Sequence, residues 1–290
     1  MHLKLRSRNL DLSVPLVMGV LNRTPDSFSD GGCHFDLDAA LHGAERMLAE
    51  GAALIDIGGE STRPGAVAVT EQEEMDRVLP LIERLHDRFD CVLSVDTMKP
   101  AVMLAACKAG AELINDVHAL RTPGALQAAV STGAGVCLMH MQGTPRTMQQ
   151  APRYGNVVSE VTGFLEQQVR RCEQAGIVRE RLCVDPGFGF GKNLQHNLVL
   201  LEKLEALSVL GLPVLVGLSR KSLLGAVSGR AMTDRVAAGS AAVALAVDRG
   251  ALIVRSHDVA ATVDAVRLGW AVRQARVPLP TSAQKMEACG

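Results

Sequence analysis

Short apolar runs alternate with longer stretches of helical periodicity eight times along this chain. The run Leu182–Val184 illustrates the pattern, because Asp185 stops it and a loop containing proline and glycine follows. Short apolar runs bounded by turn residues indicate buried strands, and apolar residues that recur every three or four positions indicate helices. The runs that we predict as strands are Leu16–Leu21, Leu54–Ile57, Cys91–Val95, Leu113–Ile114, Val136–Met139, Leu182–Val184, Val214–Gly217 and Leu252–Val254.

The stretches between these runs carry the usual signals of helix starts and ends. Residues 70–73 (Thr-Glu-Gln-Glu) form a capping-box sequence. Pro100 stands where a first helical turn is expected, and Gly110 follows the end of the same stretch. The predicted helices are Leu37–Glu50, Thr70–Phe89, Pro100–Ala109, Gly124–Ser131, Asn156–Ala175, Gln195–Leu207, Thr233–Asp248 and Asp258–Arg273, with a short helix opening at Ser219–Ser222.

A regular alternation of strands and helices with short connections predicts parallel strands joined by helical crossovers. Eight units in about 250 residues match the size of a (β/α)₈ barrel. We therefore predict the α/β class and a single-domain (β/α)₈ TIM barrel over residues 1–276, followed by a flexible tail, residues 277–290. The alternative is an open doubly wound sheet, which usually has fewer strands and gathers its ligand loops at one switch point.

Polar side chains follow almost every predicted strand. In a (β/α)₈ barrel the carboxyl ends of all strands meet on one face, and active sites lie there. Convergence on that face would explain the whole set at once, so we predict a functional site there. The residues concerned are Asn22, Asp96, Asn115, His140, Asp185, Lys221 and Arg255.

Composition excludes several classes of protein. The formal net charge of −1 argues against a general binder of nucleic acid or of anionic membranes, which would be clearly basic. The polar N-terminal stretch contains no signal-peptide core, and the most apolar late stretch, Val236–Val247, is too short to cross a bilayer. The seven cysteines include no CxxC pair, so neither a zinc site nor a disulfide framework is indicated. We expect a cytoplasmic protein.

The residue types at the strand ends suggest three kinds of binding. Asp96, Asn115 and Asp185 suit a flat 2-amino-4-oxo heterocycle, whose ring N–H and amino group form a fork that a carboxylate accepts. A diphosphate would suit a second set, in which Asn22 also offers an oxygen to Mg²⁺. Lys221 and Ser222 stand at a helix start, where backbone N–H groups favour an anion. The second set consists of Asn22, Thr62, Arg255 and His257.

Each of these residues also has an ordinary structural interpretation. Asp185 could cap the next helix, and the loop to Lys192 could be a phosphate loop, although its glycine spacing is one residue short and Asn193 replaces Ser or Thr. His257 could be a neighbour of a helix cap, and Thr62 a turn residue. The joint recurrence of polar residues at strand ends favours the functional interpretation.

Seven segments, in order along the chain, resemble the signatures of the bacterial dihydropteroate synthase family. The resemblance covers roughly residues 10–273, and segments this long in this order are highly specific. The two longest are residues 18–32 (MGVLNRTPDSFSDGG) and 56–65 (DIGGESTRPG). The others are 94–97 (SVDT), 114–116 (IND), 138–143 (LMHMQG), 185–192 (DPGFGFGK) and 219–222 (SRKS).

The resemblance implies a homodimeric (β/α)₈ barrel that joins 6-hydroxymethyl-7,8-dihydropterin diphosphate to 4-aminobenzoate and releases diphosphate, with no covalent enzyme intermediate. It implies catalytic roles for Asp96, Asp185, Lys221 and Arg255, and Mg²⁺ at Asn22. The pterin diphosphate contacts would be Thr62, Asp96, Asn115, Met139, Asp185, Phe190, Gly217, Lys221, Arg255 and His257. The 4-aminobenzoate contacts would be Phe28, Arg63, Pro64, Phe190 and Ser222, once the first two loops close.

Two positions depart from the family pattern. Arg23 stands where the family usually has a small apolar residue, and Ser256 stands where it often has valine. The first could change how the following loop closes, and the second could alter packing at a strand end.

Two rival functions stay open: a pterin-binding methyltransferase domain, and a non-catalytic barrel that only scaffolds a neighbour.

Overall fold

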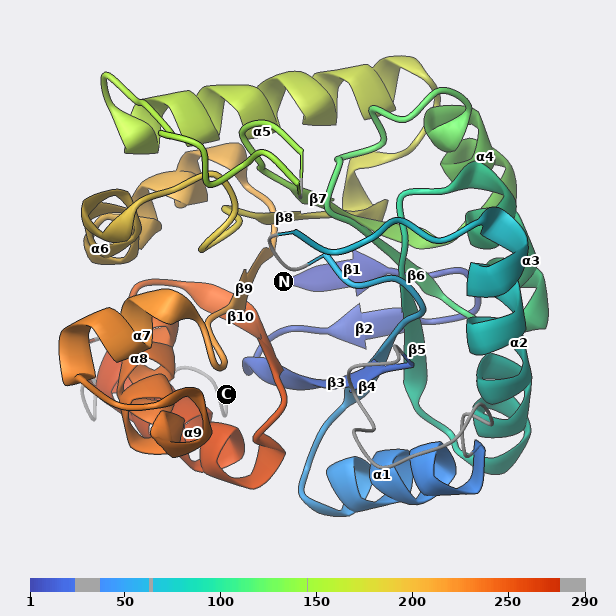
Figure 1. The fold of residues 1–290 in the computed structure, drawn as a ribbon, viewed down its shortest axis with the longest axis horizontal. Helices are drawn as coiled ribbons and strands as arrows, with labels where there is room; N and C mark the ends of the chain where they lie inside the picture. Colours follow the sequence, from blue (N-terminus) through green and yellow to red (C-terminus); the bar gives the residue numbers. More distant parts are fainter. Residues whose placement is uncertain (24–36, 63–64, 145, 277–290) are drawn as a thin grey trace, which may run out of the picture.

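Eight parallel strands close into a barrel in the computed structural model, which describes residues 1–23, 37–62, 65–144 and 146–276 (Figure 1). The strand order around the barrel is β10-β3-β4-β5-β6-β7-β8-β9, so each strand pairs with the next one along the chain, and the last strand, β10, closes the ring against the first, β3. The predicted (β/α)₈ barrel is confirmed. The strands are β3 (Leu16–Asn22), β4 (Leu54–Gly58), β5 (Val92–Asp96), β6 (Leu113–Asp116), β7 (Gly135–Met139), β8 (Leu182–Asp185), β9 (Val214–Gly217) and β10 (Ala251–Ser256).

Helices surround the barrel as an outer layer (Figure 1). The capping box predicted at Thr70 is present, because its side chain accepts from the Glu73 N–H at 3.2 Å and Glu73 Oε2 accepts from the Thr70 N–H at 2.8 Å. The helices are α1 (Leu37–Ala49), α2 (Glu71–Arg88), α3 (Pro100–Ala109), α4 (Ala125–Thr132), α5 (Val157–Gln174), α6 (Leu194–Glu202), α7 (Ser222–Ser228), α8 (Val236–Asp248) and α9 (Val259–Ala275).

Two helix predictions need correction. The stretch predicted as one helix over Gln195–Leu207 is α6 followed by a 3₁₀ segment, Leu204–Leu210, because Lys203 leaves the helical conformation with φ −103° and ψ 22°. The helix predicted over Thr233–Asp248 begins as a separate 3₁₀ turn, Met232–Asp234, before α8. Both changes lie in the outer layer and leave the strand order intact.

An N-terminal hairpin that the sequence analysis missed closes the amino end of the barrel. Its strands β1 (His2–Lys4) and β2 (Asn9–Asp11) pair antiparallel. Each is only three residues long and mostly polar, so alternation was too short to detect. The fully buried Leu3 packs with the lower ends of the barrel strands, and burying such a side chain stabilises the fold by about 1.5–3 kcal/mol.

The strand register places the carboxyl ends at a common level. Asn22 pairs with Gly58, Gly58 with Asp96, and Asp96 with Asn115. Met139 pairs with Asp185 farther round the barrel. The polar residues that follow the strands therefore share one rim, as predicted.

No helix in the described ranges is long and apolar enough to cross a bilayer. Residues 277–290, predicted to form a flexible tail, lie outside the described residues.

Candidate active site

A buried charge cluster occupies the carboxyl mouth of the barrel. Arg255, at the end of β10, donates from Nε to Asp56 Oδ2 at 2.6 Å and from Nη2 to Asp96 Oδ2 at 2.9 Å. Asp56 is fully buried within β4 and also accepts from Asn115 Nδ2 at 3.2 Å and from Ser94 Oγ at 2.5 Å. These bonds fix the planes of the Arg255 guanidinium and the Asn115 amide.

Asp56 was not among the predicted site residues. A signal was present, because Asp56 is a charged residue in the middle of an apolar strand, and a buried carboxylate needs a partner. The predicted site residues all came from strand ends and the segments that follow them, whereas Asp56 lies inside β4. Asp56 contacts Arg255 and Asn115 directly, so it orients two predicted site residues.

Asp96 retains an unused acceptor. Its Oδ1 is buried and has no hydrogen-bond partner among the described residues, whereas its Oδ2 accepts from Arg255. Burial raises the pKa of Asp96 to about 7, although the Arg255 charge opposes the rise. A buried carboxylate oxygen without a donor suits a ligand that supplies an N–H group.

Asp185, at the end of β8, is buried beside two lysines. Its Oδ1 accepts the Gly187 N–H at 2.7 Å. Burial raises the pKa of Asp185, while this hydrogen bond and the charges of Lys221 and Lys192 oppose the rise. The interpretation as a cap of the next helix is wrong, because Asn193 caps α6 by accepting the His196 N–H at 2.8 Å.

Lys221 lies over the face of Phe190, with Nζ 4.1 Å from the ring centroid. Burial lowers the pKa of Lys221 to about 8, and the Asp185 carboxylate opposes the fall. Met139 is buried and packs in one cluster with Phe190, Val117 and three further methionines. Together these side chains give the mouth a polarizable apolar wall beside its carboxylates.

The phosphate-loop interpretation of residues 187–192 is also wrong. Lys192 is 2% exposed and turns its Nζ to backbone carbonyls beneath the loop instead of toward the mouth of the barrel. A phosphate loop needs its lysine free to reach a bound phosphate.

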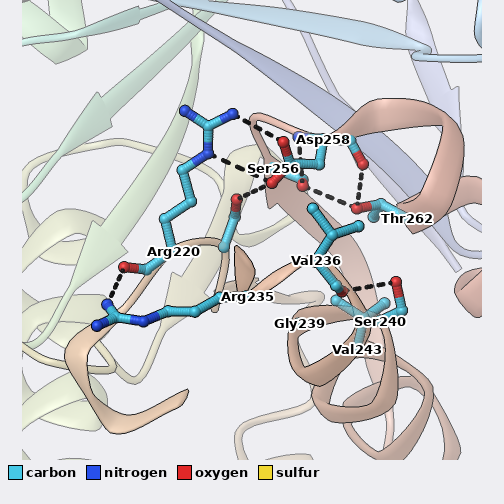
Figure 2. A pocket seen from close by; sticks show the side chains of 10 residues that line it. Arg220, Arg235, Val236, Gly239, Ser240, Val243, Ser256, Asp258 and Thr262 are labelled. Atoms are coloured by element: carbon cyan, nitrogen blue, oxygen red, sulfur yellow. Dashed lines mark hydrogen bonds and ion pairs between the residues drawn. The ribbon is translucent and has the colours of Figure 1, made fainter. Parts of the chain in front are cut away.

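The β10 end carries a second polar network, which Figure 2 shows from close by. Arg220 Nη2 donates to Asp258 Oδ1 at 2.7 Å, beside a small cavity of about 10 Å³. Ser219 Oγ accepts the His257 N–H at 3.2 Å and lies 3.1 Å from His257 Nδ1. His257 directly follows β10, two residues after Arg255, and these contacts hold it against the segment that follows β9.

The two departures from the family pattern have structural explanations. Ser256 is buried, and its Oγ accepts from the Asp258 N–H at 3.1 Å and from the Thr262 hydroxyl at 2.7 Å, which ties β10 to the start of α9 (Figure 2). Arg23 is buried, and its Nη1 donates to the Arg77 carbonyl at 2.8 Å, which ties β3 to α2.

Asn22 lies near Asp96 at the β3 end of the rim. A Cβ atom at Gly58 would lie 3.0 Å from Asn22 Oδ1 and 3.9 Å from Asp96 Oδ2, so both oxygens border the same point. The described residues contain no cluster of three His, Cys, Asp or Glu that could hold a metal ion. Mg²⁺ is commonly held by one or two protein oxygens together with substrate phosphates, and the Asn22 oxygen fits that pattern.

The remaining predicted residues fall into two groups. Thr62 is half-buried in the segment after β4, Gly217 ends β9 and pairs with Arg255, and Ser222 is exposed at the start of α7. The 4-aminobenzoate contacts predicted at Phe28, Arg63 and Pro64 lie outside the described residues, so that part of the prediction has no structural test.

Comparison with known proteins gives consistent matches over most of the chain. The family model described as pterin binding enzyme matches residues 18–257. The dihydropteroate synthase of Haemophilus influenzae is 52% identical over 95% of this chain and 100% of its own length. That of Escherichia coli is 50% identical over 95% of this chain and 98% of its own length.

Solved structures match equally well. A Yersinia pestis dihydropteroate synthase in a sulfonamide drug complex has a TM-score of 0.91 at 54% identity, covering 94% of this chain and 100% of that one. A Xanthomonas albilineans dihydropteroate synthase with 4-aminobenzoic acid has a TM-score of 0.88 at 52% identity, covering 96% and 99%. A structure of the Xanthomonas enzyme with 7,8-dihydropteroate has a TM-score of 0.86 at 49% identity, covering 97% and 100%.

Proposed function

Because this chain belongs to the dihydropteroate synthase family of pterin binding enzymes, we propose that its barrel mouth joins 6-hydroxymethyl-7,8-dihydropterin diphosphate to 4-aminobenzoate. The products are 7,8-dihydropteroate and diphosphate, in folate biosynthesis. The observation that carries the proposal is the convergence of Asp96, Asn115, Asp185 and Lys221 beside Met139 and Phe190. That set offers acceptors, a cation and an apolar wall to one flat heterocycle.

The pterin ring would lie among these groups. The Asp96 oxygen without a partner and the Asp185 carboxylate accept the ring N–H and amino groups. Lys221 donates to the ring oxygen, and Asn115, held by Asp56, adds an amide. Met139, Phe190 and Gly217 line the ring.

The diphosphate would lie at the rim between β3 and β10. Arg255 and His257 supply positive and N–H donor groups there, and Thr62 adds a hydroxyl. Asn22 would hold Mg²⁺ through its side-chain oxygen together with diphosphate oxygens. Bound Mg²⁺ neutralises charge on the leaving diphosphate.

The chemistry needs no protein nucleophile. The bond between the pterin methylene carbon and the diphosphate oxygen breaks, and both electrons leave with the diphosphate. The methylene carbon becomes cationic, with its charge spread into the ring, and the buried carboxylates Asp96 and Asp185 stabilise that charge. The amine of 4-aminobenzoate then forms the C–N bond and loses one proton.

The 4-aminobenzoate would bind on the outer side of the pterin. Phe190 provides an apolar surface, and the exposed Ser222 hydroxyl donates to the carboxylate. Phe28, Arg63 and Pro64, from the first two loops, would complete the site.

We further infer a cytoplasmic homodimer. Exposed apolar side chains lie on the neighbouring helices α8 and α9, among them Leu245 and Leu268, which are 46% and 64% exposed. The cysteines at five described positions are all free, which fits a reducing compartment. Sedimentation of the wild type and of Leu268→Glu tests the homodimer. We expect twice the monomer mass for the wild type and a lower mass for the variant.

The decisive experiment is diphosphate release from the purified protein. We expect release only when pterin diphosphate and 4-aminobenzoate are both present. Methyl transfer from a methyl-tetrahydrofolate to a corrinoid would favour the methyltransferase alternative. Pterin diphosphate binding without turnover would favour the scaffold alternative.

A further inference from the structure

The loop from Pro186 to Gly191 separates the barrel mouth from a buried ammonium. Above it lie Asp185, Phe190 and Lys221, which the proposed function assigns to the pterin. Below it lies Lys192, which that function does not use. Its side chain is among the most deeply buried charged groups described, at 2% exposed.

Three acceptors surround the Lys192 Nζ at good hydrogen-bonding distance. The carbonyl oxygens of Gly187 and Phe190 lie 2.9 and 3.1 Å away, and His140 Nδ1 lies 2.9 Å away. An ammonium has three N–H donors, so three acceptors use them all. The His140 carbonyl is a fourth, more distant neighbour at 3.5 Å.

This arrangement links the tautomer of His140 to the charge of Lys192, whose pKa burial lowers to about 7. When Lys192 is charged it can only donate, so His140 Nδ1 accepts and the imidazole carries its proton on Nε2. Burial lowers the pKa of His140 to about 3, with the Lys192 charge adding to the fall. The His140 ring also packs against the Phe164 ring in an edge-to-face contact, with the two centroids 4.9 Å apart.

The loop backbone lies so close to the segment after β7 that only glycine fits at two of its positions. Gly187 has φ +68°, and a Cβ atom there would lie 2.0 Å from the His140 carbonyl oxygen. Gly191 has φ +63°, and a Cβ atom there would lie 2.5 Å from the Gln142 carbonyl oxygen. The backbone of the loop is therefore packed directly on the segment that follows β7.

We propose that Lys192 and His140 are positioning residues for the pterin site: the ammonium, held by His140 Nδ1, binds the Gly187 and Phe190 carbonyls and thereby sets Asp185 and Phe190 for the heterocycle. Gly187 connects both ends of this chain of contacts, since its N–H binds Asp185 Oδ1 and its carbonyl binds Lys192. Phe190 is linked in the same way, through its carbonyl below and its ring above. The inference deepens the proposed function, because it assigns a role in the pterin site to two residues that contact no substrate.

The test compares a matched pair of substitutions at His140. In His140→Asn the side-chain oxygen can replace Nδ1 as the acceptor, whereas His140→Leu removes the acceptor at similar volume. The probe is 6-hydroxymethylpterin, which lacks the diphosphate, measured by calorimetry well below each melting temperature. We expect His140→Leu and Lys192→Met to raise the Kd at least tenfold, and His140→Asn to stay within threefold of the wild type.

Leu85→Ala separates positioning from a general loss of stability. Leu85 is fully buried in α2, on the far side of the barrel from β8. We expect this variant to melt at a lower temperature and to bind the pterin like the wild type. If Lys192→Met does not fold, the His140 pair decides alone.

Two results would overturn the inference while leaving the proposed function intact. One is a His140→Leu protein that binds the pterin as tightly as the wild type. The other is a Leu85→Ala protein that loses as much affinity as His140→Leu, because binding would then follow stability alone. A wild-type protein that binds no pterin would instead contradict the proposed function itself.

Discussion

Lys192 and Lys221 lie on opposite sides of the same loop near the same carboxylate, yet their surroundings differ. Below the loop, the three donors of Lys192 all have acceptors in the protein. Above it, Lys221 Nζ rests on an aromatic face and makes no hydrogen bond with any described residue. The lower region is complete without a ligand, and the upper region is not.

The same contrast separates the two acidic residues that bind Arg255. Asp56 uses both oxygens within the protein, whereas Asp96 keeps Oδ1 without a donor in the described part of the chain. Burial is similar in both cases, so burial alone does not identify a ligand contact. What separates these two residues is unused hydrogen-bonding capacity at the mouth of the barrel, and this difference can be tested residue by residue.

The largest effect should come from removing Lys221, the lysine whose N–H donors have no acceptor among the described residues. Lys221→Met deletes a charged donor to the pterin, and such a hydrogen bond contributes about 1.5–3 kcal/mol. We expect kcat/KM for pterin diphosphate to fall about 100-fold while the melting temperature holds, since no protein acceptor loses a partner. Steady-state kinetics and thermal melting measure both quantities.

Lys192→Met is the opposite control for that experiment. It leaves up to three buried acceptors without a donor, at about 1–3 kcal/mol for each. We therefore expect Lys192→Met to melt at a clearly lower temperature than the wild type. Equal melting temperatures for the two lysine variants would contradict the distinction between the two sides of the loop.

The carboxylate between the lysines should respond next. Asp185→Asn keeps the shape and can still accept the Gly187 N–H, but it loses the charge that the pterin donors and both lysines face. Because imperfect pairing of buried donors costs about 1–3 kcal/mol, pterin affinity should fall at least roughly tenfold. Calorimetry that returned a wild-type Kd would show that Asp185 serves the loop alone.

A pH titration examines the unused oxygen of Asp96. The pKa of Asp96 is raised from 3.8 to about 7, so the folded chain binds this proton more tightly than the unfolded chain. Between pH 8 and pH 6, protonation of this group should stabilise the fold as pH falls. Pterin affinity should change in the opposite direction, by about fivefold between pH 7 and pH 6, because a protonated carboxyl accepts poorly.

Lys192 and Lys221, with pKa values of about 7 and about 8, titrate in the same range. The check is therefore the difference between the wild type and Asp96→Asn in melting temperature and in pterin Kd, each followed from pH 6 to pH 8. In Asp96→Asn the contribution of this group to the melting profile should disappear. A wild-type affinity that changes with pH in the same way as that of Asp96→Asn would rule out an ionised Asp96 as the pterin acceptor.

Much of this architecture could be predicted from the sequence because its signals are local. Strand-ending polar residues such as Asp185 and Arg255 mark the rim, and the strand–helix alternation predicts the barrel. The charge of Asp56 within an apolar strand is a local signal, but its role is not, because its partners lie 38, 59 and 199 residues away, at Ser94, Asn115 and Arg255. Likewise, nothing in residues 185–192 indicates that Lys192 points away from the barrel mouth, since its acceptors come from the folded loop and from His140.

The smallest effect should come from Ser222, at the outer edge of the open region. Its hydroxyl could have capped α7, but Lys221 occupies the N-cap position without a side-chain cap bond, and Ser222 is the first, exposed residue of the helix. Ser222→Ala should therefore leave the melting temperature nearly unchanged. Loss of one hydroxyl donor to the 4-aminobenzoate carboxylate, worth about 1 kcal/mol, should raise the KM for that substrate roughly fivefold and leave the KM for pterin diphosphate unaltered. Ser222→Thr, which keeps the hydroxyl, serves as the control. A lower melting temperature with both KM values unchanged would mean that Ser222 stabilises the fold and does not contact 4-aminobenzoate. An exposed hydroxyl would then not be a sign of ligand contact.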